Sequence, residues 1–181
     1  MGRPKLLLPW RNGRTVIEQV VETLREAGAL PIYVVSGPFD AEIRRLLEHR
    51  EGVTIVYNAA FAESEMMDSL RLGIKALPDD VEAALIALGD QPQVRPEVVR
   101  ELVATYASGY PAVVVPLYQG RRGHPWVVSK ELWGDLLAGD YATPRDFLTA
   151  YLDRIVILDT ASPEILQDLD FPEDYERTRP Q

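Results

Sequence analysis

Short apolar runs alternate with amphipathic helical stripes along the chain. The runs predict strands, because they are brief, apolar and bounded by glycine, proline or polar residues. The predicted strands are 32–35, 53–58, 83–90, 112–118, 124–128 and 154–158. The stripes predict helices at 15–28, from residue 40 onward, and at 66–77, 95–108, 130–137 and 144–152.

This order predicts one α/β domain over residues 1–181, with three layers and a mostly parallel sheet. The run 83–90 is apolar until it reaches Asp90, which is typical of a central strand covered on both faces. Sheets of this kind bind ligands beyond the carboxyl ends of their strands. Functional residues are therefore expected just after the strands.

The composition excludes several classes of protein. Of 181 residues, 46% are hydrophobic and 26% are charged, which is typical of a globular domain. The net charge of −9, with no cluster of Lys and Arg, argues against a nucleic-acid partner. Without cysteine there is no disulfide, thiolate metal site or cysteine nucleophile. No apolar run approaches ~18 residues and no signal-peptide pattern opens the chain, so we expect a cytoplasmic protein with no membrane partner.

Acidic residues are the main candidates for chemistry. Asp90, in the motif LGDQP, either caps the following turn or binds a hard cation such as Mg²⁺, which takes carboxylate oxygen and keeps phosphate and water as other ligands. A single carboxylate binds Mg²⁺ weakly, so a second is expected elsewhere. The tail DLDFPEDY supplies Asp168 and Asp170 ahead of its proline, whereas Glu173 and Asp174 suit the start of a helix.

Two further side chains have both an ordinary and a functional interpretation. Lys5 is either a solvated lysine near the terminus or a cation for phosphate. His124, in RRGHP, is either structural at a strand start or part of a site, and the other histidine, His49, lies in a surface-like helical run. The chain has no serine–histidine–acid pattern, HExxH motif, P-loop motif or complete GxGxxG.

Five motifs in order, MGRPKLLLP, VVSG, LGDQP, GHP and DLDFPEDY, resemble those of the MobA/MocA-type nucleotidyltransferases, and most closely the molybdenum cofactor cytidylyltransferases. The resemblance covers essentially the whole chain. It implies the Rossmann-like fold of the nucleotide-diphospho-sugar transferases. The stretch LLLPW after Lys5 is more similar to the cytidylyl branch than to the guanylyl branch, whose stretch usually reads DKGL.

The resemblance implies a reaction and a cofactor. The reaction would transfer CMP from CTP to the terminal phosphate of molybdenum–molybdopterin and release pyrophosphate, with Mg²⁺ as cofactor. Asp90 and Asp170 would bind the metal, with Asp168 as an alternative ligand. Lys5 would neutralise charge on the phosphates, because phosphoryl-type transfer depends mainly on positioning and charge neutralisation.

Other site residues and partners follow from the same resemblance. Ser36 and Gly37 would border the base pocket, and Ser69 and His124 would line the nucleotide or pterin side. CTP and a molybdopterin-type acceptor are the implied partners, with maturation proteins of molybdenum enzymes as further candidates. Two alternatives stay open: a nucleotidyltransferase that uses GTP, another nucleotide or another phosphorylated acceptor, and a non-catalytic homologue that binds a partner or product.

The chain departs from the family pattern at its start. The family opening reads roughly LAAGxSxRMGxxKLLLP, so Met1 matches an internal methionine and Arg3 does not match the arginine of the glycine-rich loop. We therefore expect a longer natural protein whose first strand lies between 32–35 and 83–90. That strand would bury about five apolar side chains at roughly 1.5–3 kcal/mol each, which rivals the stability of a whole domain. Smaller departures are Phe171, where threonine is usual, and ESEMMDS before Leu70, where a glycine is common.

Overall fold

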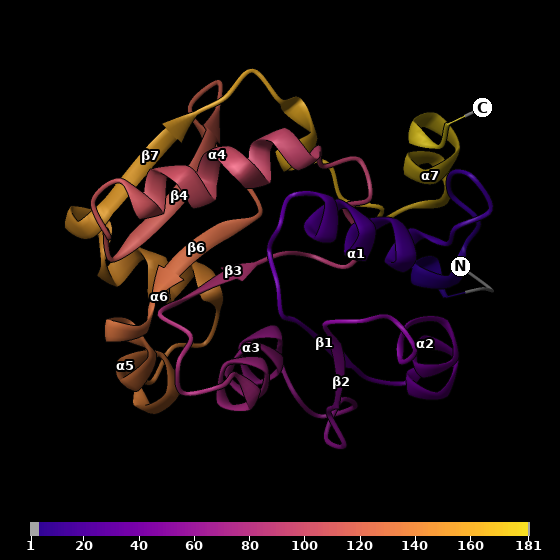
Figure 1. Ribbon diagram of the computed structural model, residues 1–181, viewed down its shortest axis with the longest axis horizontal. Coiled ribbons are helices and arrows are strands. Elements are labelled where there is room, and N and C mark those ends of the chain that lie inside the picture. Colours follow the sequence, from indigo (N-terminus) through magenta and orange to yellow (C-terminus); the bar gives the residue numbers. More distant parts are fainter. Residues whose placement is uncertain (1–3, 181) are drawn as a thin grey trace.

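The computed structural model describes residues 4–180, whose helices and strands follow the order predicted from the sequence (Figure 1). The comparison of Met1 and Arg3 with the family pattern lies outside the described residues. The helices are α1 (Val16–Glu26), α2 (Asp40–Leu47), α3 (Met66–Ala76), α4 (Pro96–Ala107), α5 (Trp133–Ala138), α6 (Pro144–Ala150) and α7 (Pro172–Thr178). The strands are β1 (Ile32–Ser36), β2 (Val53–Tyr57), β3 (Ala83–Ile86), β4 (Val113–Tyr118), β5 (Arg121–Arg122), β6 (Trp126–Ser129) and β7 (Ile155–Asp159). Strand β5 and the 3₁₀ turns Lys5–Leu7 and Pro163–Leu166 are not among the predicted elements.

Local sequence explains where the first long helix begins and ends. The Thr15 hydroxyl accepts from the Glu18 N–H at 3.4 Å, and the Thr15 N–H donates to the Glu18 carboxylate at 2.8 Å, which forms a capping box. Gly28 follows the helix with φ of +79°, a conformation that glycine adopts without strain. The buried side chains of α1 are Val16, Ile17, Val20, Val21 and Thr23.

The described strands form two separate sheets. In the first, β1 and β2 pair in parallel, from Ile32 opposite Val53 to Ser36 opposite Tyr57. In the second, the order is β3-β6-β4-β5, and β7 pairs with β4. The pairs β3–β6, β6–β4 and β4–β5 are antiparallel, and β4–β7 is parallel.

The prediction of a mostly parallel sheet is therefore wrong for the described residues. The physical reason is the short connection between β4 and β6. A chain that reverses within 119–125 returns antiparallel, whereas a parallel neighbour needs a crossover of about a dozen residues or more. Strand β6 enters between β3 and β4, which stay parallel to each other because each is antiparallel to it.

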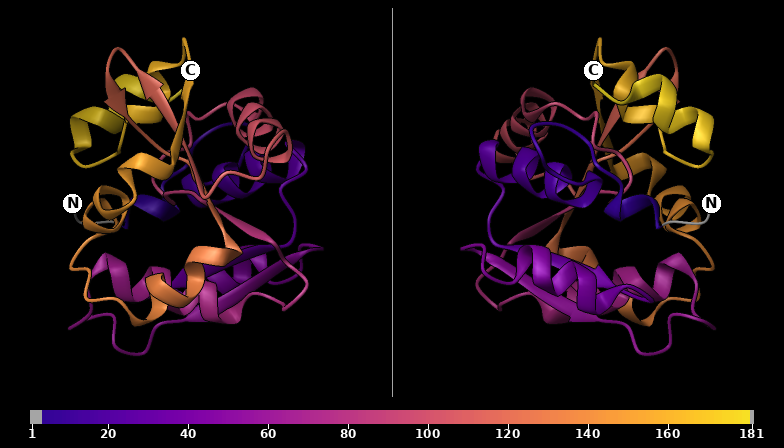
Figure 2. Two further views of the ribbon diagram at one scale, coloured as in Figure 1. Left: turned by 90° about the vertical axis from the view of Figure 1, so that its left-hand side faces the viewer. Right: turned by 90° about the vertical axis from the view of Figure 1, so that its right-hand side faces the viewer.

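Helices cover both faces of the second sheet. On one face, Val98 and Leu102 of α4 pack in a cluster with Val114 and Val127. On the other face, side chains of α3, α5 and α6 pack in a cluster with Val113 and its neighbours on the same side of the sheet. In the views of Figures 1 and 2, α4 and α1 lie above the level of β3 and α3 lies below it. Alternate residues of β4 thus pack against the helices on opposite faces of the sheet.

A cavity of about 740 Å³ separates β1 from β3. Most of its wall is apolar and comes from α1, α3, β1 and β3, for example Ile17, Ile32, Ile74 and Leu85. Among the described strands, β1 pairs only with β2 and β3 only with β6, so one edge of each is without a strand partner. This is the position at which the sequence predicts a further strand.

The two ends of the described chain pack together. Trp10 and Val16 form a buried cluster with Leu169 and Tyr175, and the Tyr175 hydroxyl donates to the carbonyl of Pro9. Both ends lie on the same side of the molecule in Figure 1. The acidic tail is therefore held beside the first described residues. Within residues 4–180, none of the helices combines the length and apolar character that a bilayer crossing requires.

Candidate functional site

Lys5 lies between two carboxylates that are distant in sequence. Its Nζ is 2.5 Å from Asp90 Oδ2 and 3.2 Å from Asp170 Oδ1. Lys5 begins a 3₁₀ turn, Asp90 stands in the turn after β3, and Asp170 stands just before α7. The Asp90 side chain is 17% exposed and that of Asp170 is 61% exposed, so the cluster is open to solvent on the Asp170 side.

The charge of Lys5 is stabilised by this placement. Burial by itself would lower the pKa of the ammonium group, but the hydrogen bonds and negative charges of Asp90 and Asp170 outweigh that effect and raise the pKa. Lys5 is therefore a permanent cation at neutral pH. Its partners are the two carboxylates that the sequence singled out as metal ligands.

Asp168 and His124 lie close to the same cluster. Burial raises the pKa of Asp168, and the charges of Asp90 and Asp170 add to the rise, while a hydrogen bond from Gln91 opposes it. Burial lowers the pKa of His124, although the charges of Asp168 and Asp90 act in the opposite direction. The imidazole is thus neutral at pH 7, although the nearby carboxylates of Asp168 and Asp90 favour its charged form.

The predicted site residues divide into two sets. Lys5, Ser69, Asp90 and His124 all line the cavity between β1 and β3, at one end of it. The other end is lined by the starts of the two strands and the residues before them, such as Pro31, Val81 and Ala83. The site residues therefore gather where β1 and β3 end, as expected for a sheet that binds ligands at its carboxyl edge.

Ser36 and Gly37 lie at the end of β1 and are not among the residues that line this cavity. Ser36 is 3% exposed, and its hydroxyl donates to Asp40. Its side chain is thus already engaged inside the protein. A Cβ at Gly37 would lie 3.1 Å from the Cβ of Phe61, so glycine lets the loop that carries Phe61 approach the end of β1.

Two buried amides were not predicted as site residues. Asn58 is 7% exposed, and its Nδ2 donates to the hydroxyls of Ser64 at 2.9 Å and Ser69 at 3.2 Å. Gln91 is 4% exposed and donates to Asp168 at 2.6 Å. The signal for each was its place, Asn58 at the end of the predicted strand 53–58 and Gln91 inside LGDQP, but an amide side chain by itself indicates no particular chemistry.

The carboxylates fit a hard divalent cation. Asp90 and Asp170 already share one cation, the Lys5 ammonium, so their oxygens approach a common point. Carboxylate oxygens are the ligands that Mg²⁺ prefers, and Mg²⁺ is commonly bound by one or two carboxylates plus phosphate and water. Over residues 4–180, no group of three or more His, Cys, Asp or Glu side chains is arranged as a metal cage. The geometry therefore suits a metal whose coordination is completed by a ligand.

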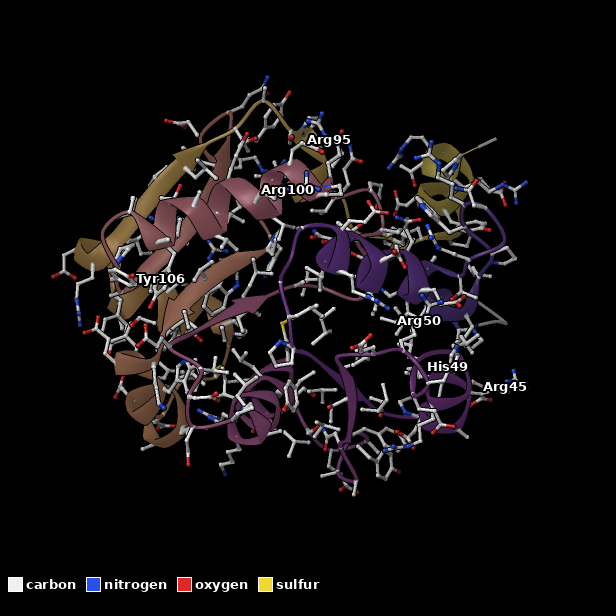
Figure 3. The ribbon with its side chains drawn as sticks, viewed as in Figure 1. Arg45, His49, Arg50, Arg95, Arg100 and Tyr106 are labelled. Atoms are coloured by element: carbon white, nitrogen blue, oxygen red, sulfur yellow. The ribbon has the colours of Figure 1, made fainter. Side chains whose placement is uncertain are left out.

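Basic side chains do not gather on one surface of the described chain. Figure 3 shows Arg45, His49 and Arg50 at α2 and after it, whereas Arg95 and Arg100 lie at α4. His49 is exposed and lies far from His124 in sequence.

The MobA-like NTP transferase domain matches residues 1–155, which is most of the chain. The chain belongs to the MobA-like NTP transferase family. It is 23% identical over 175 residues to the molybdenum cofactor cytidylyltransferase of Escherichia coli (strain K12), a match that covers 97% of this chain and 86% of that relative.

Solved structures of similar proteins share the fold. A nucleotidyl transferase from Methanothermobacter thermautotroptrophicus (Mth528) is 28% identical, with a TM-score of 0.79 over 97% of this chain and 83% of that one. The Rv0371c protein of Mycobacterium tuberculosis H37Rv, solved in complex with manganese, is 25% identical, with a TM-score of 0.74 over 97% of this chain and 91% of that one. The α/β nucleotidyltransferase fold and the family predicted from the sequence are thereby confirmed.

Proposed function

We propose that this member of the MobA-like NTP transferase family transfers CMP from CTP to the terminal phosphate of molybdenum-bound molybdopterin, with release of pyrophosphate. The observation that carries the proposal is the Lys5 ammonium between Asp90 and Asp170, at the end of the cavity where β1 and β3 finish. The base and the acceptor rest on the motif resemblance and on the Escherichia coli relative.

In this reaction an oxygen of the acceptor phosphate attacks the α-phosphorus of CTP, and the bond from that phosphorus to the oxygen of the leaving pyrophosphate breaks. Mg²⁺, when bound by Asp90 and Asp170, would supply positive charge against the phosphate oxygens. A divalent cation between these carboxylates would displace the Lys5 ammonium from them. Lys5 is then available to neutralise phosphate charge.

The remaining predicted residues have supporting roles. Asp168 adds a further acidic group beside the metal ligands, and neutral His124 and the Ser69 hydroxyl line the cavity on the nucleotide or pterin side. The Ser36 hydroxyl is engaged by Asp40, so Ser36 and Gly37 would border the base pocket through their backbone at the end of β1. Each of these side chains is within the described part of the chain, so each can be tested by substitution.

A panel of nucleotides tests the proposal. We expect CTP with Mg²⁺ to raise the melting temperature more than GTP, ATP or UTP does, and we expect Asp90→Ala to abolish the effect of Mg²⁺. Loss of a preorganised charge-stabilising group commonly costs on the order of 10²–10³ in rate, so turnover of Asp90→Ala should fall at least that far. A larger shift with GTP would favour another nucleotide. Full activity in Asp90→Ala would overturn the metal assignment, and no nucleotide binding at all would favour the non-catalytic alternative.

A further inference from the structure

Gln91 connects the turn after β3 to the acidic tail. Its Nε2 donates to Asp168 Oδ1 at 2.6 Å and to the carbonyl oxygen of Ile165 at 3.4 Å. The side chain is buried, and its Oε1 has no hydrogen-bond partner among the described residues. Gln91 directly follows Asp90, one candidate metal ligand. Its side chain hydrogen-bonds the segment that contains the other candidate ligand, Asp170.

A second contact anchors the same segment from the loop before β6. The His124 N–H donates to the Ile165 carbonyl at 3.0 Å, so that carbonyl accepts from both His124 and Gln91. A Cβ at Gly123 would lie 2.3 Å from the Ile165 oxygen, which shows how closely the two backbones approach. Ile165 and Leu169 are fully buried. The segment 165–170 is therefore fixed against the loop before β6 by these hydrogen bonds and by the burial of Ile165 and Leu169.

The Asp168 carboxylate needs a hydrogen-bond donor to hold it, because other negative charges lie nearby. Asp168 is partly buried beside the negative charges of Asp90 and Asp170, which repel it. Like charges in a shared site destabilise each other unless hydrogen bonds or cations compensate. A neutral amide donor holds the carboxylate in place and leaves its negative charge available. A lysine or arginine at the same position would instead add a competing cation.

We propose that Gln91 is a positioning residue, which holds Asp168 and the segment 165–170 so that Asp170 meets Asp90 at the distance a divalent cation needs. The part of this proposal that concerns the cation rests on the proposed function. The docking of the segment does not depend on it. Some residues orient metal ligands from outside the coordination shell. Their substitution typically changes metal affinity or activity by about 10–100-fold.

The test compares Gln91→Met, which keeps the size of the side chain and removes the donor, with Gln93→Met as a matched control. Gln93 is two residues further on, and its side-chain nitrogen and oxygen have no hydrogen-bond partner among the described residues. In the metal-free protein, we expect faster hydrogen exchange at the backbone amides of 165–170 in Gln91→Met only. By calorimetric titration with Mn²⁺, we expect about 10–100-fold weaker binding in Gln91→Met and unchanged binding in Gln93→Met.

A double-mutant cycle with Asp168→Asn identifies the route of the effect. If Gln91 acts through Asp168, the loss of Mn²⁺ affinity in Gln91→Met should largely vanish in the Asp168→Asn background. Faster exchange with unchanged Mn²⁺ affinity would make Gln91 merely structural and overturn the positioning role. Unchanged exchange in the metal-free Gln91→Met protein would overturn the docking. Absence of Mn²⁺ binding in the wild-type protein would overturn the proposed metal site instead, and the exchange experiment would still decide the docking.

Discussion

Lys5 and its two partners show how single residues define the candidate site. The sequence offered Lys5 as either a solvated lysine or a phosphate-binding cation, and the structure places its ammonium between Asp90 and Asp170. The hydrogen bonds span 85 and 165 residues along the chain. No local pattern reports contacts over such separations, because they depend on how the whole chain folds.

Removal of Lys5 should expose the repulsion between its partners. We expect Lys5→Met to lower the melting temperature in metal-free buffer, because Asp90 and Asp170 lose their shared cation. Mg²⁺ should then stabilise the variant more than it stabilises the wild-type protein, since the ion no longer competes with the ammonium group. Melting curves with and without Mg²⁺ measure both effects. Exposed Lys75 on α3 serves as the control, and equal Mg²⁺ responses in wild type and Lys5→Met would contradict the prediction.

The two acidic groups of the tail should behave differently. Asp174 accepts from the Phe171 N–H at 2.9 Å and pairs with Arg177 at 2.6 Å, so it stabilises the start of α7. We expect Asp170→Asn to reduce nucleotidyl transfer by at least tenfold, whereas Asp174→Asn should lower the melting temperature and leave turnover largely unchanged. Steady-state kinetics and melting curves of both variants provide the measurement. Similar losses of turnover in the two would mean that the tail acts only through its fold.

His124 should make stability fall on acidification. Burial lowers its pKa in the folded protein from 6.5, so below about pH 6.5 the unfolded chain binds a proton that the folded protein does not. Stability from this group is therefore complete above that pH and is lost as the pH decreases. We expect the melting temperature of His124→Asn to fall less between about pH 7.5 and pH 5 than that of wild type or of the control His49→Asn. Parallel pH profiles for all three proteins would show that His124 does not carry the dependence.

At the scale of elements, the close approach of the loop before β6 to the tail is the decisive packing feature. The strand periods in the sequence predict β4 and β6 individually, but the reversal between them sets their direction. That reversal brings Gly123 and His124 against the 3₁₀ turn Pro163–Leu166. The short β5 and this turn lack an apolar period long enough to be recognised, so they were not predicted.

Gly123→Ala should displace the tail. The added Cβ would meet the Ile165 carbonyl oxygen at 2.3 Å, a contact that requires backbone movement. We expect a lower melting temperature and faster hydrogen exchange over 165–170. Gly109→Ala is the matched control, because a Cβ there meets nothing within 4 Å. A Gly123→Ala protein with wild-type exchange and stability would show that the tail accommodates the methyl group at no cost.

At the scale of the whole molecule, the main feature is the cavity of about 740 Å³ between the two sheets. Its strand edges carry backbone groups without a strand partner in the described chain, and its wall is mostly apolar. A strand placed there would hydrogen-bond to both edges and bury apolar side chains.

An extended apolar peptide of about five residues, a common strand length, should therefore bind between β1 and β3. We expect such a peptide in excess to raise the melting temperature and to slow hydrogen exchange at Val35 and Leu85, whose N–H groups face away from β2 and β6. The same peptide with its central residue replaced by proline is the control, because proline removes a backbone donor and breaks strand pairing. If both peptides have the same effect, or neither has any, the cavity does not accept a strand.

Local patterns were sufficient for the order of helices and strands, for the start of α1 at Thr15, and for a strand that leads to Asp90, although β3 ends at Ile86 rather than at residue 90. Each of these depends on neighbours within a few residues, whose spacing the chain itself displays. The insertion of β6 between β3 and β4, the cavity beside β3, and the meeting of Lys5 with Asp90 and Asp170 became clear only from the folded chain. They depend on contacts between segments far apart in sequence, and hydrophobic burial, which drives those contacts, is not directional and so leaves no local mark of which partners will meet.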